Sequence, residues 1–466
     1  MRNILLIGAG RSASTLIRYL LDNSKKENWQ ITVADISLEL AKQKTDGHSN
    51  VRAIAFDMNN ESQLGQEIKK ADIVISLLPA TLHLPVAKEC LAQKKNFVTA
   101  SYVSKQMKEL DPDVQKAGII FLNEIGLDPG IDHLSAMQVI DEVKAKGGKI
   151  ITFKSYCGGL VAPESNDNPW GYKFTWNPRA VVVAGQSGDG TGATAQYLEN
   201  GKIKFIPYQR LFSTIETVNI ARGKGLTYAK FEAYPNRDSL SYKEVYGLHD
   251  VKSMLRGTLR MPGFCRAWNT FVQLGITDDN CKVPAIDNIT WPELIEFFLP
   301  GSKTGSVKKK LANFLHEKEN SPVMKKLEWL GIFKKQKIGW PTLISSLQRE
   351  GGEISPAEIL LDLLMKKWNL KEHDKDMVVM QHEFEYILPG AKKRGYITSS
   401  LVVMGEDQTN TAMSKTVGLP LGISTKLILN QKINLKGVCI PTVREIYNPV
   451  LSELENFNIQ FIKNHS

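Results

Sequence analysis

The chain of 466 residues is 42% hydrophobic and 23% charged, a composition typical of a globular protein with about two to four domains. Its apolar runs are too short to cross a bilayer, and its five cysteines lack the spacing of a metal site or a disulfide framework. The net charge of +10 is spread out and not interleaved with aromatic residues. We therefore expect no nucleic acid, membrane or metal as a partner, no signal peptide, and a cytoplasmic location.

Strand-like and helix-favouring segments alternate through the first part of the chain. The apolar, strand-like runs lie at residues 3–8, 29–35, 51–57, 72–79, 96–101 and 118–124. Such alternation is typical of βαβ units, which build a parallel sheet between layers of helices. We therefore predict an α/β fold with a Rossmann-type, doubly wound parallel sheet.

The turn after the first strand carries a glycine-rich motif. Gly8, Gly10 and Ala13 form a G-x-G-x-x-A pattern between a strand and a helix. Glycine permits the tight turn and the close approach of a pyrophosphate, which would bind the free N–H groups at the helix N-terminus. In this context the motif predicts a dinucleotide-binding site.

Acidic and polar residues end the next strands. Asp35, at the end of the second strand, can accept both hydroxyl groups of an adenosine ribose and would repel a 2′-phosphate. This favours NAD over NADP, although Asp35 could instead cap the following helix, and Arg11 could meet a 2′-phosphate. Asp57 is a candidate neighbour of the adenine, and Ser76 ends the fourth strand beside the expected cofactor groove.

The fifth and sixth strands bring further polar residues to the same edge of the sheet, where open parallel sheets bind ligands. Ser101 and Tyr102 follow the fifth strand, and "LNEIGLDPGIDHL" follows the sixth. Within that motif Asp128 could hold a substrate amine or cap the next helix. We expect Glu124 to be a structural partner and Asp132 to cap the helix.

After residue 148 the pattern changes to longer strands, loops rich in Pro, Asn and Trp, and a mostly helical stretch. This predicts an α+β substrate domain with a helical insertion, and a surface loop at residues 185–194. The boundaries that we expect rest on a family resemblance whose segments follow: it implies 1–130 for the Rossmann domain, completed by about 426–466, then 131–280 and 371–425 for the mixed α/β domain, and 281–370 for the helical domain.

Six long segments resemble, in order, the saccharopine reductase family, which is the L-glutamate-forming saccharopine dehydrogenase family. They are "VISLLPATLH", "TASYVS", "NEIGLDPGIDHL", "SYCGGLVAPESNDNPWGYKFTW", "YPNRDSL" and "RGTLR", and the likeness continues to "TVGLPLGISTKLIL". The resemblance implies an oxidoreductase of lysine metabolism that interconverts saccharopine with L-glutamate and 2-aminoadipate 6-semialdehyde, using NAD or NADP. It also implies a homodimer, formed through the saccharopine-binding α/β domain.

The resemblance further implies individual contacts. Substrate contacts fall on Ser101, Tyr102, Asp128, Arg237, Thr258, Leu259 and Arg260. Cofactor contacts fall on Ala9, Gly10, Arg11, Ser12, Ser76, Leu77, Leu127 and Trp176. Fungal NADP-using members carry an arginine just after the second strand, where this chain has Asp35 followed by Ile36. This departure also favours NAD.

The chemistry of saccharopine suits these residue types. Its carboxylates suit the planar guanidinium groups of Arg237 and Arg260, for which structural ion pairs are the alternative role. Oxidation of its secondary amine gives an imine, whose hydrolysis needs a proton carrier near neutral pH. Candidate carriers are Tyr102, Cys157, Lys173 and His133, and His133 is expected mainly to make structural hydrogen bonds.

We take Asp128, which could hold the amine or the developing iminium, with Tyr102 and Cys157 as the catalytic set. The alternative function is a carboxynorspermidine or other opine-type dehydrogenase, because these enzymes share the Rossmann half and the joining of an amine to an aldehyde. "YPNRDSL" and "RGTLR" favour saccharopine, since they supply the carboxylate-binding arginines of the closer family.

Overall fold

The computed structural model describes residues 1–45, 47–186, 194–220, 230–283, 289–301, 304–339 and 354–466. Contacts between residues divide the chain into two compact units. The first comprises residues 1–151, 244–250 and 375–466, and the second comprises 152–243 and 251–374. Most of the surface loop predicted at 185–194 lies outside the described residues. The three-domain boundaries expected from the sequence stay a prediction.

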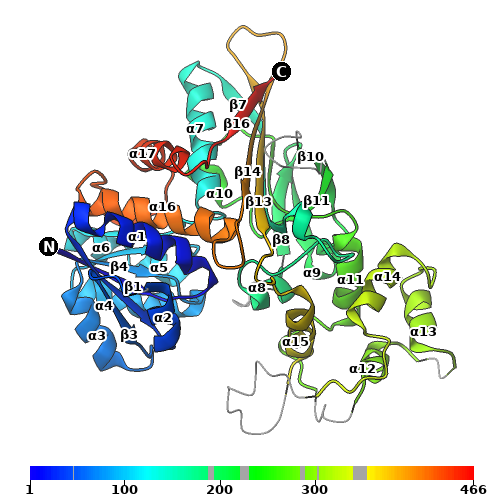
Figure 1. The fold of residues 1–466 in the computed structure, drawn as a ribbon. Coiled ribbons are helices and arrows are strands. Elements are labelled where there is room, and N and C mark those ends of the chain that lie inside the picture. Colours follow the sequence, from blue (N-terminus) through cyan, green and yellow to red (C-terminus); the bar gives the residue numbers. More distant parts are fainter. Residues whose placement is uncertain (46, 187–193, 221–229, 284–288, 302–303, 340–353) are drawn as a thin grey trace. The chain divides into compact units, whose positions relative to one another are not determined.

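The first unit contains a seven-stranded parallel sheet with the order β15-β6-β5-β4-β1-β2-β3 (Figure 1). Its strands are β1 Arg2–Ile7, β2 Trp29–Asp35, β3 Val51–Ala55, β4 Ile73–Ser76, β5 Asn96–Thr99, β6 Ile120–Leu122 and β15 Gly437–Cys439. The strand order reverses between β1 and β4, the place where doubly wound sheets bind ligands. This confirms the predicted Rossmann-type sheet.

Helices and 3-10 turns connect these strands, and the sheet is buried beneath them. They are η1 Arg11–Ala13, α1 Ser14–Glu27, α2 Leu38–Thr45, α3 Glu61–Lys70, η2 Ala80–Leu82, α4 His83–Ala92, α5 Lys105–Glu109, α6 Asp111–Ala117 and α7 Ile131–Ala145. Every residue of β4 is buried, as are Ile4 to Ile7 of β1, because a parallel sheet is covered on both faces. Leu5, Val74 and Phe97 lie in one core cluster with helix residues such as Ile68.

A C-terminal helix packs against the first helix of the same unit. In Figure 1, α16 (Ala412–Leu429) lies beside α1, and the N–H of Thr15 donates to Ser414 Oγ at 2.9 Å. Glycine makes this approach feasible: a Cβ on Gly418 would lie 2.7 Å from the backbone nitrogen of Leu16. Two helices whose contacting residues are 399 positions apart in the sequence therefore pack against each other.

The remaining elements of the first unit are α17 Arg444–Glu455 and the antiparallel strands β13 Asp376–Ile387, β14 Gly395–Met404 and β16 Ile462–His465. The buried carboxylate of Asp376 accepts the N–H groups of Ala412 (2.6 Å) and Met413 (3.0 Å) at the N-terminus of α16. Two otherwise unpaired helix N–H groups are thereby satisfied. In the described part of the chain, no helix is both long and apolar enough to cross a membrane.

The chain enters the second unit within β7 (Lys149–Val161), which pairs parallel with β12, and β12 pairs antiparallel with β11 and β8. The strands here are β8 Thr194–Glu199, β9 Lys202–Pro207, β10 Glu216–Asn219, β11 Lys230–Pro235 and β12 Ser253–Arg260. The helices are η3 Pro163–Ser165, α8 Pro178–Val182, α9 Tyr208–Leu211, α11 Phe264–Leu274, α12 Trp291–Phe298, α13 Val307–Phe314, α14 Pro322–Leu330 and α15 Pro356–Trp368, and α10 Tyr242–Val245 crosses from this unit into the first. The unit is α+β, as predicted.

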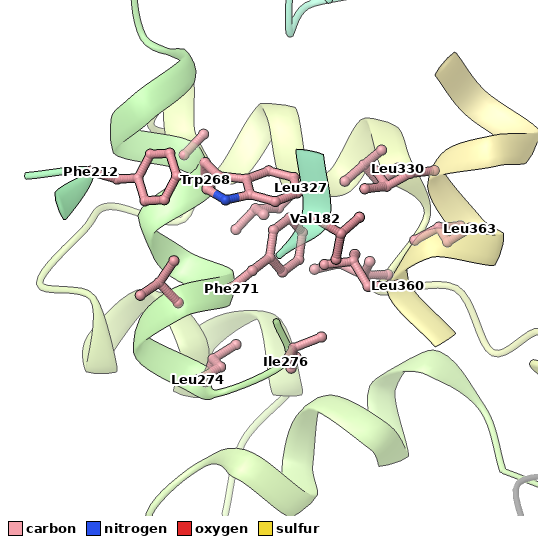
Figure 2. Packing of buried hydrophobic residues seen from close by; sticks show 14 of the residues in the cluster. Val182, Phe212, Trp268, Phe271, Leu274, Ile276, Leu327, Leu330, Leu360 and Leu363 are labelled. Carbon is pink, nitrogen blue, oxygen red and sulfur yellow. The ribbon is translucent and has the colours of Figure 1, made fainter. Parts of the chain in front are cut away.

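An aromatic core holds the helices of the second unit together. Trp170 stacks on Phe271 with 12° between the ring planes, and Phe264 stacks on Trp268 with 11°. Figure 2 shows Trp268 and Phe271 of α11 packed among leucines of α14 and α15. Burying aromatic rings of this size gives a large hydrophobic stabilisation. This core supports one end of β12, whose residues matter below.

Candidate active site

The glycine-rich turn after β1 has the geometry of a phosphate-binding loop. Gly8 has a φ of +103°, its N–H donates to the Ala34 carbonyl at 2.8 Å, and a Cβ there would lie 3.0 Å from the Leu77 carbonyl oxygen. A Cβ on Gly10 would meet no described heavy atom within 4 Å. The turn thus needs glycine at position 8 for its own shape and leaves open space over position 10. This space, next to the start of η1, fits a dinucleotide pyrophosphate.

The carboxylate of Asp35 is fixed against this turn. One oxygen accepts the N–H of Ala9 at 2.7 Å, and the other accepts the N–H of Ser37 at 3.0 Å. Each oxygen can accept a second hydrogen bond, as two ribose hydroxyl groups would require. The next side chain, Ile36, is 81% exposed and carries no charge. The Asp35 carboxylate is therefore held in place at the end of β2, and its role in binding a ribose stays a prediction.

Two more charged residues lie near this end of the sheet. Lys44 of α2 donates a hydrogen bond to the carbonyl of Gly10, and burial lowers its pKa to about 8 while Asp35 opposes that shift. Lys44 is not among the site residues predicted from the sequence, because a lysine in an amphipathic helix is ordinarily exposed to solvent. Asp57 is exposed, and its Oδ1 accepts the backbone N–H of Asn59 at 2.9 Å.

A buried histidine joins the ends of β4 and β5. His83 Nδ1 lies 2.8 Å from Ser76 Oγ, and His83 Nε2 lies 2.6 Å from Ser101 Oγ. Thr99 Oγ1 donates to the Ser76 carbonyl at 2.9 Å and lies 3.5 Å from His83 Nε2. Burial lowers the pKa of His83 to about 4, so the imidazole is neutral at physiological pH. The predicted cofactor contact Ser76 and the predicted substrate contact Ser101 are thus connected through one residue.

The loop after β6 presents Asp128 to the ligand-binding edge. The N–H of Gly126 donates to the Pro129 carbonyl at 2.9 Å, and a Cβ on Gly130 would come within 2.0 Å of Gly126. The peptide bond between Asp128 and Pro129 is cis. In this tight turn Leu127 and Pro129 are buried, whereas Asp128 is half-buried. The turn therefore leaves one carboxylate accessible at the sheet edge.

Tyr102, which follows β5, bonds directly to that carboxylate. Its hydroxyl donates to Asp128 Oδ1 at 3.1 Å, and its side chain is also half-buried. Two of the three predicted catalytic residues, Tyr102 and Asp128, are therefore in contact with each other. Tyr102 directly follows the predicted substrate contact Ser101 in the sequence.

The other acids of the loop have structural partners. Glu124 has a φ of +56°; it accepts the N–H of Val103 at 2.9 Å and lies 2.9 Å from His133 Nε2. His133 is fully buried, and its Nδ1 lies 2.5 Å from the Tyr246 hydroxyl. These contacts agree with the structural roles expected for Glu124 and His133.

The expectation that Asp132 caps α7 was wrong. The N-cap position is Gly130, which has no side-chain cap, and Asp132 lies inside the first turn, where its Oδ1 accepts the N–H of Gly130 at 2.6 Å. The close approach of Gly130 to Gly126 shifts the start of the helix, and a carboxylate in the first turn still interacts favourably with the helix dipole.

In the second unit, strand pairing places two predicted site residues, Cys157 and Thr258, next to each other. Tyr234 of β11 pairs with Thr258 of β12, which pairs in turn with Cys157 of β7. Gly158 allows β7 to approach β12 closely, because a Cβ there would lie 2.8 Å from Leu259. Cys157 and Leu259 are buried, and Thr258 is half-buried.

Arg260, at the end of β12, is a buried cation. It is 3% exposed, and its guanidinium carbon lies 5.0 Å from the ring centre of Tyr172 and 5.3 Å from that of Phe264. Its hydrogen bonds to described residues go to the Leu259 carbonyl (2.9 Å) and the Tyr234 hydroxyl (3.3 Å), neither of which is charged. Its Nε has no hydrogen-bond partner there. A buried guanidinium without a counter-charge fits an anion-binding role.

The other predicted residues of this unit differ in character. Arg237 is exposed with a φ of +51°. Lys173 is buried, and its ammonium contacts Asp374 at 2.7 Å and Asp167 at 2.9 Å, which favours a structural ion pair over proton transfer. Trp176 is half-buried against the aromatic core. Among the described residues, no cluster of three or more His, Cys, Asp or Glu could hold a metal ion.

Comparison with known proteins connects these features to a family. Residues 4–122 match the family described as saccharopine dehydrogenase NADP binding domain, and residues 126–459 match its C-terminal domain. The chain is 36% identical to a saccharopine dehydrogenase [NADP(+), L-glutamate-forming] of Pyricularia oryzae, over 98% of both sequences. It is also 34% identical to mouse mitochondrial alpha-aminoadipic semialdehyde synthase, over 99% of this chain and 47% of that protein.

A solved structure shows the same fold. Apo saccharopine dehydrogenase (L-Glu forming) from Saccharomyces cerevisiae is 34% identical, with a TM-score of 0.85 and 100% coverage of both chains. The chain therefore belongs to the saccharopine dehydrogenase family, in its L-glutamate-forming branch.

Proposed function

We propose that the chain oxidises saccharopine, with water and NAD, to L-glutamate and 2-aminoadipate 6-semialdehyde in lysine metabolism. The observation that carries this proposal is the buried guanidinium of Arg260, which has no negatively charged partner among the described residues. Isolated buried charge is costly, by several kcal/mol per ion, unless a partner compensates it. A substrate carboxylate would supply that partner, and saccharopine carries three carboxylates.

The second unit supplies the binding groups for those carboxylates. Arg260 presents a planar donor surface that can bind a carboxylate through two parallel hydrogen bonds. Thr258 lies two residues before it on β12 and adds a half-buried hydroxyl group. Arg237 follows β11, and its exposed guanidinium group is suited to bind another of the three carboxylates of saccharopine. Cys157 remains a candidate proton carrier beside Thr258.

The first unit supplies the groups for amine chemistry. Asp128 is negatively charged and accessible, so it can hold the protonated secondary amine of saccharopine and then the iminium that forms from it. Tyr102 donates to the same carboxylate and can pass a proton toward the departing nitrogen. The turn from Gly8 to Ser12 would hold the pyrophosphate, and the bound nicotinamide supplies the hydride acceptor.

Asp35 supports NAD as the preferred cofactor. Its carboxylate is fixed by two backbone N–H groups at the end of β2, where it would repel a 2′-phosphate. The fungal relatives are named as NADP(+)-dependent enzymes. The family pattern for NADP-using fungal members has an arginine just after the second strand, where this chain has Asp35 followed by Ile36. Lys44 and Arg11 are cations at that end of the sheet, and either could instead bind a 2′-phosphate. A homodimer and a cytoplasmic location stay predictions from the sequence.

The test is turnover of saccharopine by the purified chain with NAD+ or NADP+, followed by the absorbance of the reduced cofactor. We expect turnover with saccharopine, and a kcat/KM at least about tenfold higher with NAD+, since a repelled phosphate costs more than about 1.4 kcal/mol. Turnover of carboxynorspermidine without turnover of saccharopine would establish the alternative function instead. A higher kcat/KM with NADP+ would contradict the role of Asp35.

A further inference from the structure

The imidazole of His83 lies between two hydroxyl groups, and nothing in the proposed reaction yet uses it. Ser76 Oγ lies 2.8 Å from Nδ1 and Ser101 Oγ lies 2.6 Å from Nε2, and the ring is 5% exposed. His83 is the first residue of α4, so the helix fixes its position, and the phenyl ring of Phe97 on β5 packs edge-on against it. The ring therefore has little freedom to turn away from the two serines.

A neutral imidazole has one N–H donor and one acceptor nitrogen. The two serine hydroxyls must therefore bond to it in opposite senses, one as donor and the other as acceptor. Thr99 cannot donate to the ring, because its proton already goes to the Ser76 carbonyl at 2.9 Å. As an acceptor it lies 3.5 Å from Nε2, farther than the 2.6 Å of Ser101 Oγ. The orientation of the Ser101 proton is therefore determined by which nitrogen of His83 carries hydrogen.

We propose that His83 is a positioning residue that orients the Ser101 hydroxyl toward a carboxylate of the substrate. With hydrogen on Nε2, the ring donates to Ser101 Oγ and leaves the Ser101 proton free to donate to the carboxylate. Nδ1 then accepts the Ser76 proton, which holds that tautomer in place. This role rests on the proposed function, because it assumes that Ser101 contacts saccharopine.

Two amide substitutions separate the two ends of the ring. His83→Gln places its amide at the level of Nε2 and can still donate to Ser101, whereas His83→Asn places its amide at the level of Nδ1 and can bond only to Ser76. We expect His83→Asn to raise KM for saccharopine about tenfold, the value of one hydrogen bond to a charged group, with kcat changed less than KM. His83→Gln should stay within about threefold of the wild type.

A matched control exists in the same unit. His382 is also fully buried, and its Nε2 lies 2.7 Å from Ser135 Oγ, with the two residues on β13 and α7. His382→Asn should lower the melting temperature without changing KM for saccharopine. A double-mutant cycle adds a second test: Ser101→Ala should raise KM as much as His83→Asn, and the double variant should be no worse than either. If His83→Asn does not fold, the same cycle is run with His83→Gln. In that case adding His83→Gln to Ser101→Ala should cause no further change in KM for saccharopine.

The proposal is overturned if His83→Gln and His83→Asn change KM equally, or if the effects of His83→Asn and Ser101→Ala on KM add. It is also overturned if KM changes only in proportion to melting temperature, as for a purely structural residue. A wild-type chain that binds NADH but does not turn over saccharopine would contradict the proposed function itself, and this role would fail with it.

Discussion

Arg260 and Asp35 are the charged residues on which the proposed chemistry depends most, and each is held by uncharged groups of the chain. Arg260 bonds to a carbonyl and a phenol, and Asp35 bonds to two backbone N–H groups. Neither side chain forms an ion pair with another described residue. Each therefore remains available to a ligand, and each can be tested by removing it.

Replacing Arg260 should impair substrate binding without destabilising the fold. We expect Arg260→Met to raise KM for saccharopine by tenfold to a hundredfold, the range for a hydrogen bond to a charged group. The free energy of unfolding should change by less than about 1 kcal/mol, because removing a buried uncompensated charge offsets the two lost hydrogen bonds. Steady-state kinetics and denaturant unfolding measure the two effects. Arg266→Met, at a surface arginine paired with Glu317 in the same unit, is the control and should leave KM unchanged.

Removing the negative charge of Asp35 should relax the choice of cofactor. We expect Asp35→Ala to raise kcat/KM for NADP+ relative to that for NAD+ by about tenfold or more, because the repulsion of the 2′-phosphate is lost while ribose hydrogen bonds weaken. Asp57→Ala is the matched control, since Asp57 is an exposed acid after the next strand. An unchanged ratio in Asp35→Ala would show that another residue, of which Lys44 is the nearest candidate, sets the preference.

The burial of His83 also predicts a pH dependence of stability. Its pKa falls from 6.5 in the unfolded chain to about 4 in the fold, so between these values the unfolded chain binds the proton and the folded chain does not. The stability contributed by neutral His83 is complete above pH 6.5 and is lost as pH falls toward 4, by on the order of 3 kcal/mol. His83→Gln should remove this part of the pH slope. Equal slopes for both proteins in denaturant unfolding would contradict it.

Single residues were predictable from sequence where a motif constrains the backbone, and less so elsewhere. Gly8, Gly10 and Asp35 have fixed places in a strand-turn-helix unit, and each was found where that unit requires it. His83 begins α4 and Lys44 lies within α2. No spacing in the sequence distinguishes either residue from an ordinary surface residue of a helix. Their importance follows only from which strands end beside them.

At the scale of elements, the strands were the most predictable part. The expected runs at 3–8 and 72–79 became Arg2–Ile7 and Ile73–Ser76, because strands that are buried on both faces read as continuous apolar runs in the sequence. The tight turn from Gly126 to Gly130 was not predictable, since its shape depends on contacts between two glycines and Ala100. That turn displaced the helix cap from Asp132.

The pairing of α1 with α16 makes a stability prediction for elements. Gly418→Ala should lower the free energy of unfolding by about 1–3 kcal/mol, because the new Cβ would lie 2.7 Å from the Leu16 backbone nitrogen and would separate the helices. Gly65→Ala in α3 is the control, where a Cβ would meet the flexible ends of two side chains, Glu89 at 3.3 Å and Gln93 at 3.9 Å. Helix propensity should there raise stability by up to about 1 kcal/mol. Similar effects at both positions in chemical denaturation would contradict close packing of α1 and α16.

At the scale of the whole molecule, fold class followed from the alternation of strands and helices, whereas the division of the chain did not. The C-terminal strand β15 joins the Rossmann sheet beside β6, a return that local pattern cannot reveal and that only the family resemblance suggested. Residues 244–250 belong to the first unit although their neighbours on both sides belong to the second. Tyr246 shows why: its hydroxyl lies 2.5 Å from His133 Nδ1 and its carbonyl accepts Lys144 Nζ at 3.0 Å, and both partners belong to α7.

The proposed reaction breaks one particular carbon–nitrogen bond of saccharopine. The secondary amine has two neighbouring carbons that carry hydrogen, and hydride can leave either one. Incubation with saccharopine and NAD+, followed by mass spectrometry of the products, distinguishes them. If the proposed reaction occurs, the products are L-glutamate and 2-aminoadipate 6-semialdehyde, with equal amounts of L-glutamate and NADH. Formation of lysine and 2-oxoglutarate would contradict it.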